Sequence, residues 1–251
     1  KYWMIYPIEK WFANHRTDLL ITITNEDFLR AKKKFKCRVA HMHGVGVDSN
    51  RFHPINREEQ DKYRKLLNLG HDDFVILCTG ELNENKNQET LIRAIGLVKN
   101  EISNVKLLIA GNGPLKKYLE ELIGELKLTN YVTLLGYRTD LEKIVPCVDL
   151  IATASFREGL PLNVIEGMLC GKPVLASINR GHKELIKEGI NGNLFVPNNI
   201  EECGELILNI YKNNKMISCE NIINSVNEYM NGNVLNEFDQ IIYEFTKQRE
   251  H

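Results

Sequence analysis

Glu158 and Glu166 form a pair of glutamates eight positions apart, within the segment 155–168 (SFREGLPLNVIEGM). This segment follows a short apolar run and begins a helix-length amphipathic stretch. Carboxylates accept hydrogen bonds from hydroxyl groups, often two at a time. The residue types and their spacing therefore suggest recognition of sugar or ribose hydroxyls.

Between the two glutamates, the sequence predicts a helix start at which an anion could bind. Pro161 suits the first helical turn, because its missing N–H would be unpaired there in any case. The amides near Leu162 and Asn163 should then point outward, toward an anion such as phosphate. Glutamates on either side of a diphosphate could hold the two sugars of a nucleotide-sugar. An alternative stays open at this point: Glu158 caps the helix, and Glu166 is a solvated helix residue.

The elements that must position these residues are short apolar runs that alternate with helix-length amphipathic stretches. Most runs are continuous, as strands of a parallel sheet covered on both faces require. This alternation predicts βαβ units and a Rossmann-like, doubly wound parallel α/β sheet. The expected strands are 19–24, 74–79, 105–110, 131–135, 150–152, 173–177 and 193–196, with another around 39–42; the expected helices include 58–69, 88–100, 115–127, 162–170, 183–188, 201–213 and 234–247.

Four of the expected strands run into a glycine or another small residue, at Gly80, Gly111, Gly136 and Ser155. Each could be an ordinary turn between a strand and a helix. Ligands of open α/β sheets bind outside the carboxyl ends of the strands. Together, the four breaks predict flexible or closely approaching backbone along that edge.

The composition is that of an ordinary globular protein, with 251 residues, 43% hydrophobic and 26% charged. A formal net charge of -1 argues against a nucleic-acid-binding protein, which is usually strongly basic. No apolar run approaches the ~20 residues that span a bilayer. Six cysteines without a C-x-x-C pair, and no signal-like start, favour buried reduced thiols in the cytoplasm.

The pattern divides the chain into four parts. Residues 1–43 are expected to be the C-terminal remnant of a second α/β domain, because they are too few to bury a core alone. Residues 44–56 form a linker, 57–220 the main α/β domain, and 221–251 a helical segment. An apolar stripe in that last segment must pack on another element.

The motifs now allow a family to be named. The E-x7-E segment, together with motifs in the same order elsewhere, resembles retaining glycosyltransferases of the GT-B fold, family 4. The resemblance covers about residues 40–200, and its capsular and exopolysaccharide branch is the most similar. The supporting motifs are GELNENKNQ at 80–88, AGNGP at 110–114, LGYRTD at 135–140, GKPV at 171–174, NRGH at 179–182 and EGING at 188–192.

The resemblance implies a role for each matching residue. Residues 57–220 would be the nucleotide-sugar donor domain, with 1–43 left from the acceptor domain and 221–251 crossing back to it. Glu166 would bind ribose hydroxyls, Glu158 hydroxyls of the transferred sugar, and Lys86 the diphosphate. Glu158 and Lys86 are the expected catalytic residues. The remaining donor-binding residues would be Gly80, Gly113, Tyr137, Arg138, Gly159, Leu160, Leu162, Asn163 and His182.

One position departs from the family pattern. Many members carry an arginine where this chain has Glu81, and that arginine pairs with the lysine on the diphosphate. A carboxylate facing phosphate would be repelled. Either Glu81 points away, or Arg138, Lys172 or Arg180 supplies the second positive charge.

The function implied is retaining transfer of a sugar from a nucleoside diphosphate sugar to a growing polysaccharide or lipid-linked glycan. A UDP-sugar is preferred, a GDP-sugar is the alternative, and neither a cofactor nor a metal is expected. Two other functions stay open: a fragment that binds nucleotide-sugar without turnover, and a GT-B-like UDP-sugar epimerase.

Several polar residues have more than one interpretation. A basic run, residues 30–38, is either a solvated helix end or a contact with an anionic membrane at its inner face. His41 and His43 have a spacing that could suit metal, but no third ligand lies nearby in the sequence. His182 either contacts donor phosphate or caps the helix that follows. Tyr137 follows a strand directly and is expected to belong partly to the core.

Overall fold

A computed structural model describes residues 2–213 and 218–247 of the chain. The chain divides into two compact units, residues 49–226 and residues 1–48 with 227–251. Each unit is described separately.

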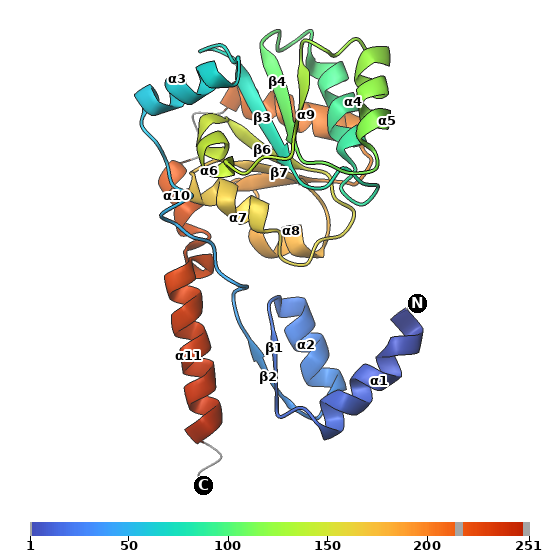
Figure 1. Ribbon diagram of the computed structural model, residues 1–251, viewed down its shortest axis with the longest axis vertical. Helices are drawn as coiled ribbons and strands as arrows, with labels where there is room; N and C mark the ends of the chain where they lie inside the picture. The colour runs from blue at the N-terminus through green and yellow to red at the C-terminus, as the bar shows by residue number, and fades with distance from the viewer. Residues whose placement is uncertain (1, 214–217, 248–251) are drawn as a thin grey trace. The chain divides into compact units, whose positions relative to one another are not determined.

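The larger unit is built on six parallel strands in the order β5-β4-β3-β6-β7-β8 (Figure 1). All residues of β3, β6 and β7 are buried, as the continuous apolar runs predict for strands covered on both faces. The prediction of a doubly wound parallel sheet is confirmed. The strands are β3 (Phe74–Thr79), β4 (Val105–Ala110), β5 (Val132–Gly136), β6 (Leu150–Thr153), β7 (Val174–Ser177) and β8 (Gly192–Phe195).

Helices follow the strands and cover the sheet. Helix α4 packs against α5 and α9, whereas α7 packs against β7 and α10. The chain winds outward from β3 through β4 to β5, and then returns to place β6 on the other side of β3. This reversal creates a switch point between β3 and β6, where the carboxyl ends of the strands leave an opening. The helices are α3 (Arg57–Leu66), α4 (Gln88–Val98), α5 (Lys116–Glu125), α6 (Leu141–Ile144), α7 (Leu162–Leu169), α8 (Arg180–Leu185), α9 (Ile200–Asn213) and α10 (Cys219–Asn224), with a 3-10 turn at Val145–Cys147.

Arg64 on α3 is a buried charge that joins three segments of this unit. Its guanidinium donates to the backbone oxygens of Cys147, His71 and Asp73, and to the carboxylate of Asp149 at 2.8 Å. That carboxylate also accepts from the amide of Val75 at 2.7 Å. Because these partners belong to the segment that leads into β3 and to the turn before β6, Arg64 attaches α3 to both.

The smaller unit holds a two-stranded parallel sheet of β1 and β2. The backbone amide of Val47 donates to the oxygen of Tyr229 at 2.9 Å, and the amide of Asn231 donates to the oxygen of Val47 at 3.0 Å. These bonds fix the segment after β2 to the start of α11. The elements are α1 (Tyr2–His15), β1 (Leu19–Thr22), α2 (Asn25–Lys34), β2 (Arg38–His41), a 3-10 turn at Asn227–Tyr229, and α11 (Asn231–Lys247).

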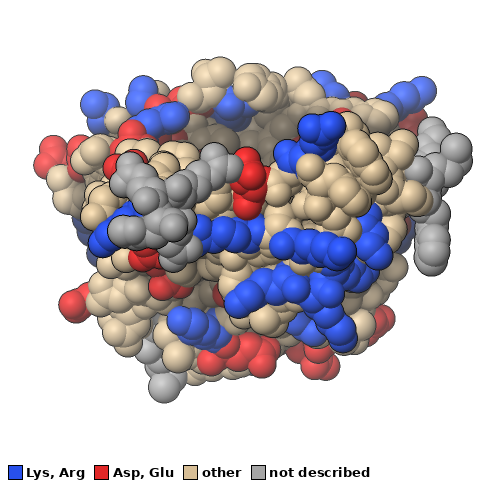
Figure 2. All heavy atoms as spheres, turned by 90° about the horizontal axis from the view of Figure 1, so that it is seen from below, with Lys and Arg blue, Asp and Glu red and all other residues tan. Residues whose placement is uncertain are grey.

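The basic run lies at the end of α2, where Lys32, Lys33 and Lys34 are exposed. Figure 2 shows a face of the molecule on which Lys and Arg side chains gather. Among the described residues, no helix is both long and apolar enough to cross a membrane. Contact with an anionic membrane surface stays a prediction.

Two expectations about local structure are wrong. The helix expected at 183–188 begins earlier, at Arg180, because the side chain of Asn179 accepts from the amide of His182 and caps it there. All six cysteines are free, as expected, but only Cys78, Cys147, Cys170 and Cys203 are buried. Cys219 is exposed and Cys37 is half-buried.

Replacing Arg64 with methionine should lower the free energy of unfolding by about 3 kcal/mol, because Asp149 would remain as a partly buried charge without its cation. Urea denaturation followed by circular dichroism measures the change. Lys65→Met, an exposed position on the same helix, is the matched control and should shift stability by less than about 0.5 kcal/mol. Equal stability of the two variants would contradict a structural role for the buried arginine.

Candidate functional site

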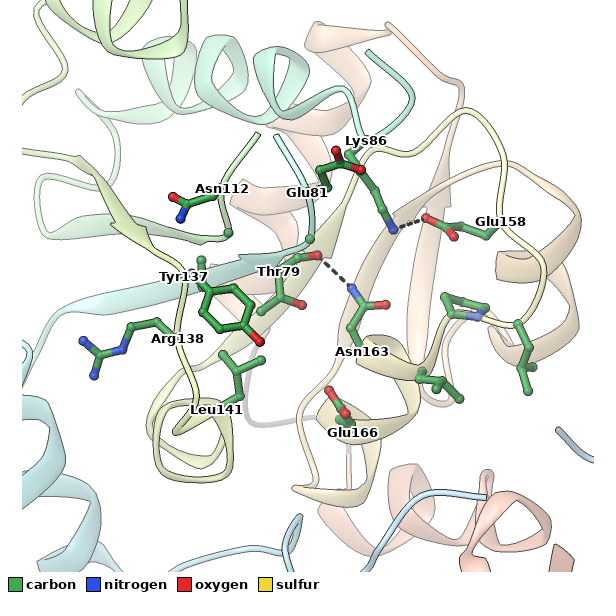
Figure 3. A pocket seen from close by; sticks show the side chains of 16 residues that line it. Thr79, Glu81, Lys86, Asn112, Tyr137, Arg138, Leu141, Glu158, Asn163 and Glu166 are labelled. Carbon is green, nitrogen blue, oxygen red and sulfur yellow. Dashed lines mark hydrogen bonds and ion pairs between the residues drawn. The ribbon is translucent and has the colours of Figure 1, made fainter. Parts of the chain in front are cut away.

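A cavity of about 610 Å³ opens at the carboxyl ends of β3, β4 and β5, beside the start of α7. It lies at the switch point between β3 and β6. Its walls come from four loops that the parallel sheet brings to one edge (Figure 3). The lining residues are Thr79, Gly80, Glu81, Lys86, Ala110, Gly111, Asn112, Tyr137, Arg138, Leu141, Glu158, Leu160, Pro161, Leu162, Asn163 and Glu166.

The close approach of two loops requires glycine at the back of this cavity. Gly111 has a φ of +154°, and a Cβ atom added there would overlap the carbonyl oxygen of Gly80. Any side chain at Gly111 would therefore push the β3 and β4 loops apart. This confirms the expectation of closely approaching backbone along the edge.

The N-terminus of α7 faces the cavity. No side chain among the described residues caps this helix at Pro161. The Asn163 side chain donates to the backbone oxygen of Thr79 at 3.2 Å, which attaches the first turn to the end of β3. Leu162 and Asn163 both line the cavity, so the positive end of the helix dipole acts on it.

Lys86 and Glu158 form an ion pair inside the cavity, with 2.6 Å between Nζ and Oε1. Their side chains are 23% and 14% exposed, respectively. Their loops are attached to each other, because the amide of Phe156 donates to the oxygen of Asn85 at 2.8 Å. Glu158 therefore contacts a cation instead of capping α7, and the alternative interpretation of this residue is wrong.

Glu166 lies one turn into α7, and Figure 3 shows its carboxyl group at the cavity. Burial raises the pKa of Glu166 to about 7, while the positive charge of Arg51 opposes part of the rise. At neutral pH the group is thus divided between its carboxylate and its protonated form. Glu166 is half-buried and lines the cavity, so the interpretation as a solvated helix residue is also wrong.

Tyr137 and Arg138 follow β5 and form the opposite wall with Leu141. Tyr137 is 74% exposed, so the expectation that it belongs to the core is wrong. The strand ends one residue earlier, at Gly136, and the tyrosine ring lies beyond the sheet. Arg138 donates twice to Asp140, at 2.9 and 2.7 Å, and its charge is already paired.

Of the three residues considered for the second positive charge, Arg138 lines the cavity and is paired with Asp140, and its role at an anion stays a prediction. Glu81 lines the cavity, and its carboxylate accepts from the side chain of Asn83 at 2.8 Å. Lys172 and Arg180 lie outside the lining, and burial lowers the pKa of Lys172. Within the described lining, the groups that could act on an anion are Lys86, the paired Arg138 and the α7 amides.

His182 is fully buried, although it was expected at the donor site. Its Nδ1 lies 2.6 Å from the backbone oxygen of Ser177 and 2.8 Å from the side chain of Asn179. Burial lowers its pKa, and the Ser177 contact opposes part of that change. It lies outside the cavity lining. His182 does not cap α8, since Asn179 does so.

Nine of the twelve predicted site residues line the cavity. Gly113, Gly159 and His182 do not. A Cβ atom at Gly113 would overlap the backbone of Leu82, which is a packing reason for glycine there. The site prediction did not include Asn112, in the loop after β4, or Leu141, the first residue of α6. Asn112 lies within the AGNGP motif, whereas Leu141 had no signal besides its position shortly after an expected strand.

Comparison with known proteins places the chain in a family. The family model for glycosyl transferases group 1 matches residues 59–228. The chain belongs to this family.

Relatives of this glycosyltransferase chain include EpsD of Bacillus subtilis, 39% identical over 195 residues, which cover 76% of this chain and 51% of EpsD. A second relative is the UDP-Gal:alpha-D-GlcNAc-diphosphoundecaprenol alpha-1,3-galactosyltransferase of Escherichia coli, 28% identical over 242 residues, which cover 90% of this chain and 62% of that protein. The chain therefore spans about half to two thirds of the length of these relatives.

Solved structures of similar fold include Anabaena Alr3699/HepE in complex with UDP. Its TM-score is 0.85 at 23% identity, and the match covers 95% of this chain and 67% of that one. The fold assignment is thus independent of close sequence similarity.

Replacing Gly181 with alanine should displace the loop that carries Glu158 and Gly159. A Cβ atom there would overlap the oxygen of Gly159 and lie 3.0 Å from Cβ of Glu158. We expect a loss of about 1–3 kcal/mol in the free energy of unfolding, as for other overpacked sites. Chemical denaturation measures the loss, and a crystal structure of the variant should show Glu158 displaced from Lys86.

Gly124→Ala is the matched control, because Gly124 lies in the last turn of α5 and nothing lies within 4 Å of a Cβ atom added there. Alanine there should be stabilising by about 0.5–1 kcal/mol. An unchanged 158–159 loop in Gly181→Ala would show that the close contact does not position Glu158.

Proposed function

We propose that the cavity binds a nucleoside diphosphate sugar, and that the protein transfers its sugar to a glycan acceptor with retention. The observation that carries the proposal is the meeting of three features in one cavity. These are the Lys86–Glu158 ion pair, the uncapped start of α7, and the carboxyl group of Glu166. Together they offer groups for a diphosphate and for hydroxyls on both sides of it.

Lys86 is assigned to the diphosphate. On ligand binding it exchanges its contact with Glu158 for phosphate oxygens, and the α7 amides donate to the same group. Negative charge builds on the leaving diphosphate as the glycosidic bond breaks, and these groups stabilise it. Glu158, released from Lys86, accepts hydrogen bonds from hydroxyls of the transferred sugar.

Glu166 is assigned to the ribose, and the wall of Tyr137, Arg138 and Leu141 to the base. The exposed tyrosine ring and the adjacent Leu141 side chain offer apolar surface for packing. UDP is the preferred nucleotide, since HepE is described in complex with UDP and UDP-glucose and the E. coli relative is named for a UDP-sugar. Both observations concern other proteins, and they support UDP as the proposed nucleotide of this chain.

The acceptor is proposed to be a growing polysaccharide or a lipid-linked glycan. The support is the name of the E. coli relative, whose acceptor is a diphosphoundecaprenol-linked sugar. We assign residues 57–220 to donor binding and residues 1–43 with 221–251 to the acceptor side. Calorimetric titration of the chain with UDP and with GDP tests the donor assignment, and binding of neither nucleotide would contradict it.

Lys86→Met should weaken UDP binding about 10- to 100-fold, because a charge-assisted hydrogen bond to phosphate contributes about 1.5–3 kcal/mol. Isothermal titration calorimetry measures the affinity. The control Lys116→Met removes an exposed lysine paired with Glu120 on α5 and should leave the affinity unchanged. Equal UDP affinities of the two variants would contradict the assignment of Lys86 to the diphosphate.

Affinity for UDP-glucose should rise as pH increases through about 7. Hydroxyl donors favour the carboxylate form of Glu166, so the ligand must displace a proton below that pH and need not above it. UDP-glucose suits the test better than UDP, because its diphosphate has no ionisation near neutral pH. Calorimetry in two buffers of different ionisation enthalpy also measures the released proton.

Glu166→Gln is the matched variant. It should remove the pH dependence near 7 and the proton release together, while the protein stays folded. If the affinity of this variant for UDP-glucose kept the same pH dependence, another group would titrate near 7, and the assignment of Glu166 to the ribose would lose this support.

A further inference from the structure

Two histidines and a glutamate meet in the smaller unit, whereas the cavity described above belongs to the larger one. His41 ends β2, His43 follows two residues later, and Glu237 lies in the second turn of α11. One ligand atom from each of these three side chains lies within 4.8 Å of the others. The sequence pattern showed only the two histidines, because Glu237 is 194 positions away from His43.

The backbone that carries these side chains is held on both sides. The amide of Met42 donates to the oxygen of Thr22 at 2.9 Å and extends the β1–β2 pairing past His41. Gly46 has a φ of +80°, and a Cβ atom there would overlap the side chain of Asn231 at the start of α11. The strand end and the helix are therefore brought close together by packing that does not involve the three side chains.

The distances within the cluster suit a tetrahedral ion. Nδ1 of His43 lies 3.1 Å from each carboxylate oxygen of Glu237. Ligand atoms on a tetrahedral Zn²⁺ at 2.0–2.1 Å are about 3.3 Å apart. The rings of His41 and His43 lie 4.9 Å apart at 85°. The ligand atom of His41 lies within 4.8 Å of the other two, so a three-ligand face requires the His41 ring to move toward them.

A second carboxylate lies on the far side of the His43 ring. Oε1 of Glu228 is 3.9 Å from Nε2 of His43. When one ring nitrogen of a histidine binds a metal, the other usually donates to a carboxylate, a backbone oxygen or water, and that bond orients the ring. Glu228 is placed for this role, with Nδ1 left to face Glu237. The ring of Tyr229 packs on His43 at 5.3 Å and restricts it further.

We propose that His41, His43 and Glu237 bind a divalent transition metal ion, with Zn²⁺ as the preferred metal. Two imidazoles and one carboxylate form a ligand set that Zn²⁺ takes with a water in the fourth position. The ion would link the end of β2 to α11, two elements at opposite ends of the sequence. It would thereby stabilise the smaller unit, independently of the nucleotide-sugar site.

Cobalt titration of the metal-free chain tests the site, because tetrahedral Co²⁺ absorbs in the visible range and Zn²⁺ then displaces it. Cys219→Ser serves as the background, since that thiol is exposed and could bind metal. We expect one equivalent of Co²⁺ without a thiolate charge-transfer band, and a melting temperature that rises with Zn²⁺. His41→Ala, His43→Ala and Glu237→Gln should each weaken binding more than about tenfold, and Glu228→Gln about tenfold.

His71→Ala is the matched control. His71 forms an exposed pair with Asp61, 3.0 Å apart, and its loss should leave cobalt binding unchanged. Histidine ¹⁵N chemical shifts of the unsubstituted chain identify the ligating nitrogens without any variant, so misfolding of a variant leaves the test intact. Absence of stoichiometric binding, a thiolate band, or ¹⁵N shifts unmoved by Zn²⁺ would each overturn the proposal and leave His43–Glu237 as a hydrogen-bonded pair only.

Discussion

The opening between β3 and β6 is the constraint on which the rest of the site depends. The chain reverses its direction of winding at this point, so the loops after β3 and after β6 turn away to opposite faces of the sheet. A helix start, a lysine loop and a glutamate loop can then reach the same space without crossing. Gly111 keeps that space narrow at the back, where the β3 and β4 loops are in contact through their backbones.

Burial determines which groups at this opening are chemically unusual. Glu158 and Glu166 are both glutamates of one loop and helix, but their surroundings differ. Glu158 has a cation at 2.6 Å and stays paired, whereas desolvation dominates at Glu166 and raises its pKa to about 7. Two carboxyl groups of one short motif thus differ chemically because of their neighbours, not because of their spacing.

The sequence predicted well those features that depend on local pattern. Continuous apolar runs identified the strands, and the E-x7-E segment placed Glu158 and Glu166 at a strand–helix junction. The local pattern did not give the burial or the contacts of individual side chains. His182 is buried outside the cavity lining, with Nδ1 beside Ser177 and Asn179, and its donor role stays a prediction. Tyr137 is exposed because β5 ends just before it.

The three-residue cluster of the smaller unit shows the same limit. Glu237 reaches His43 only because α11 returns to the end of β2, and no local pattern in the sequence predicts that contact. The expected domain boundaries near 43, 57 and 220 likewise depend on how the two ends of the chain pack. These boundaries stay predictions. The structure itself divides the chain into two compact units, residues 49–226 and residues 1–48 with 227–251.

The ion pair between Lys86 and Glu158 has a consequence for selectivity in a cell rich in free inorganic phosphate. An anion that attracts Lys86 leaves Glu158, which is 14% exposed, without a counter-charge. Leaving a mostly buried carboxylate in that state opposes binding. A ligand that carries hydroxyl donors beside its phosphates satisfies both residues at once. Under the proposed function, the pair would therefore favour phosphates that carry neighbouring hydroxyl groups over simple anions.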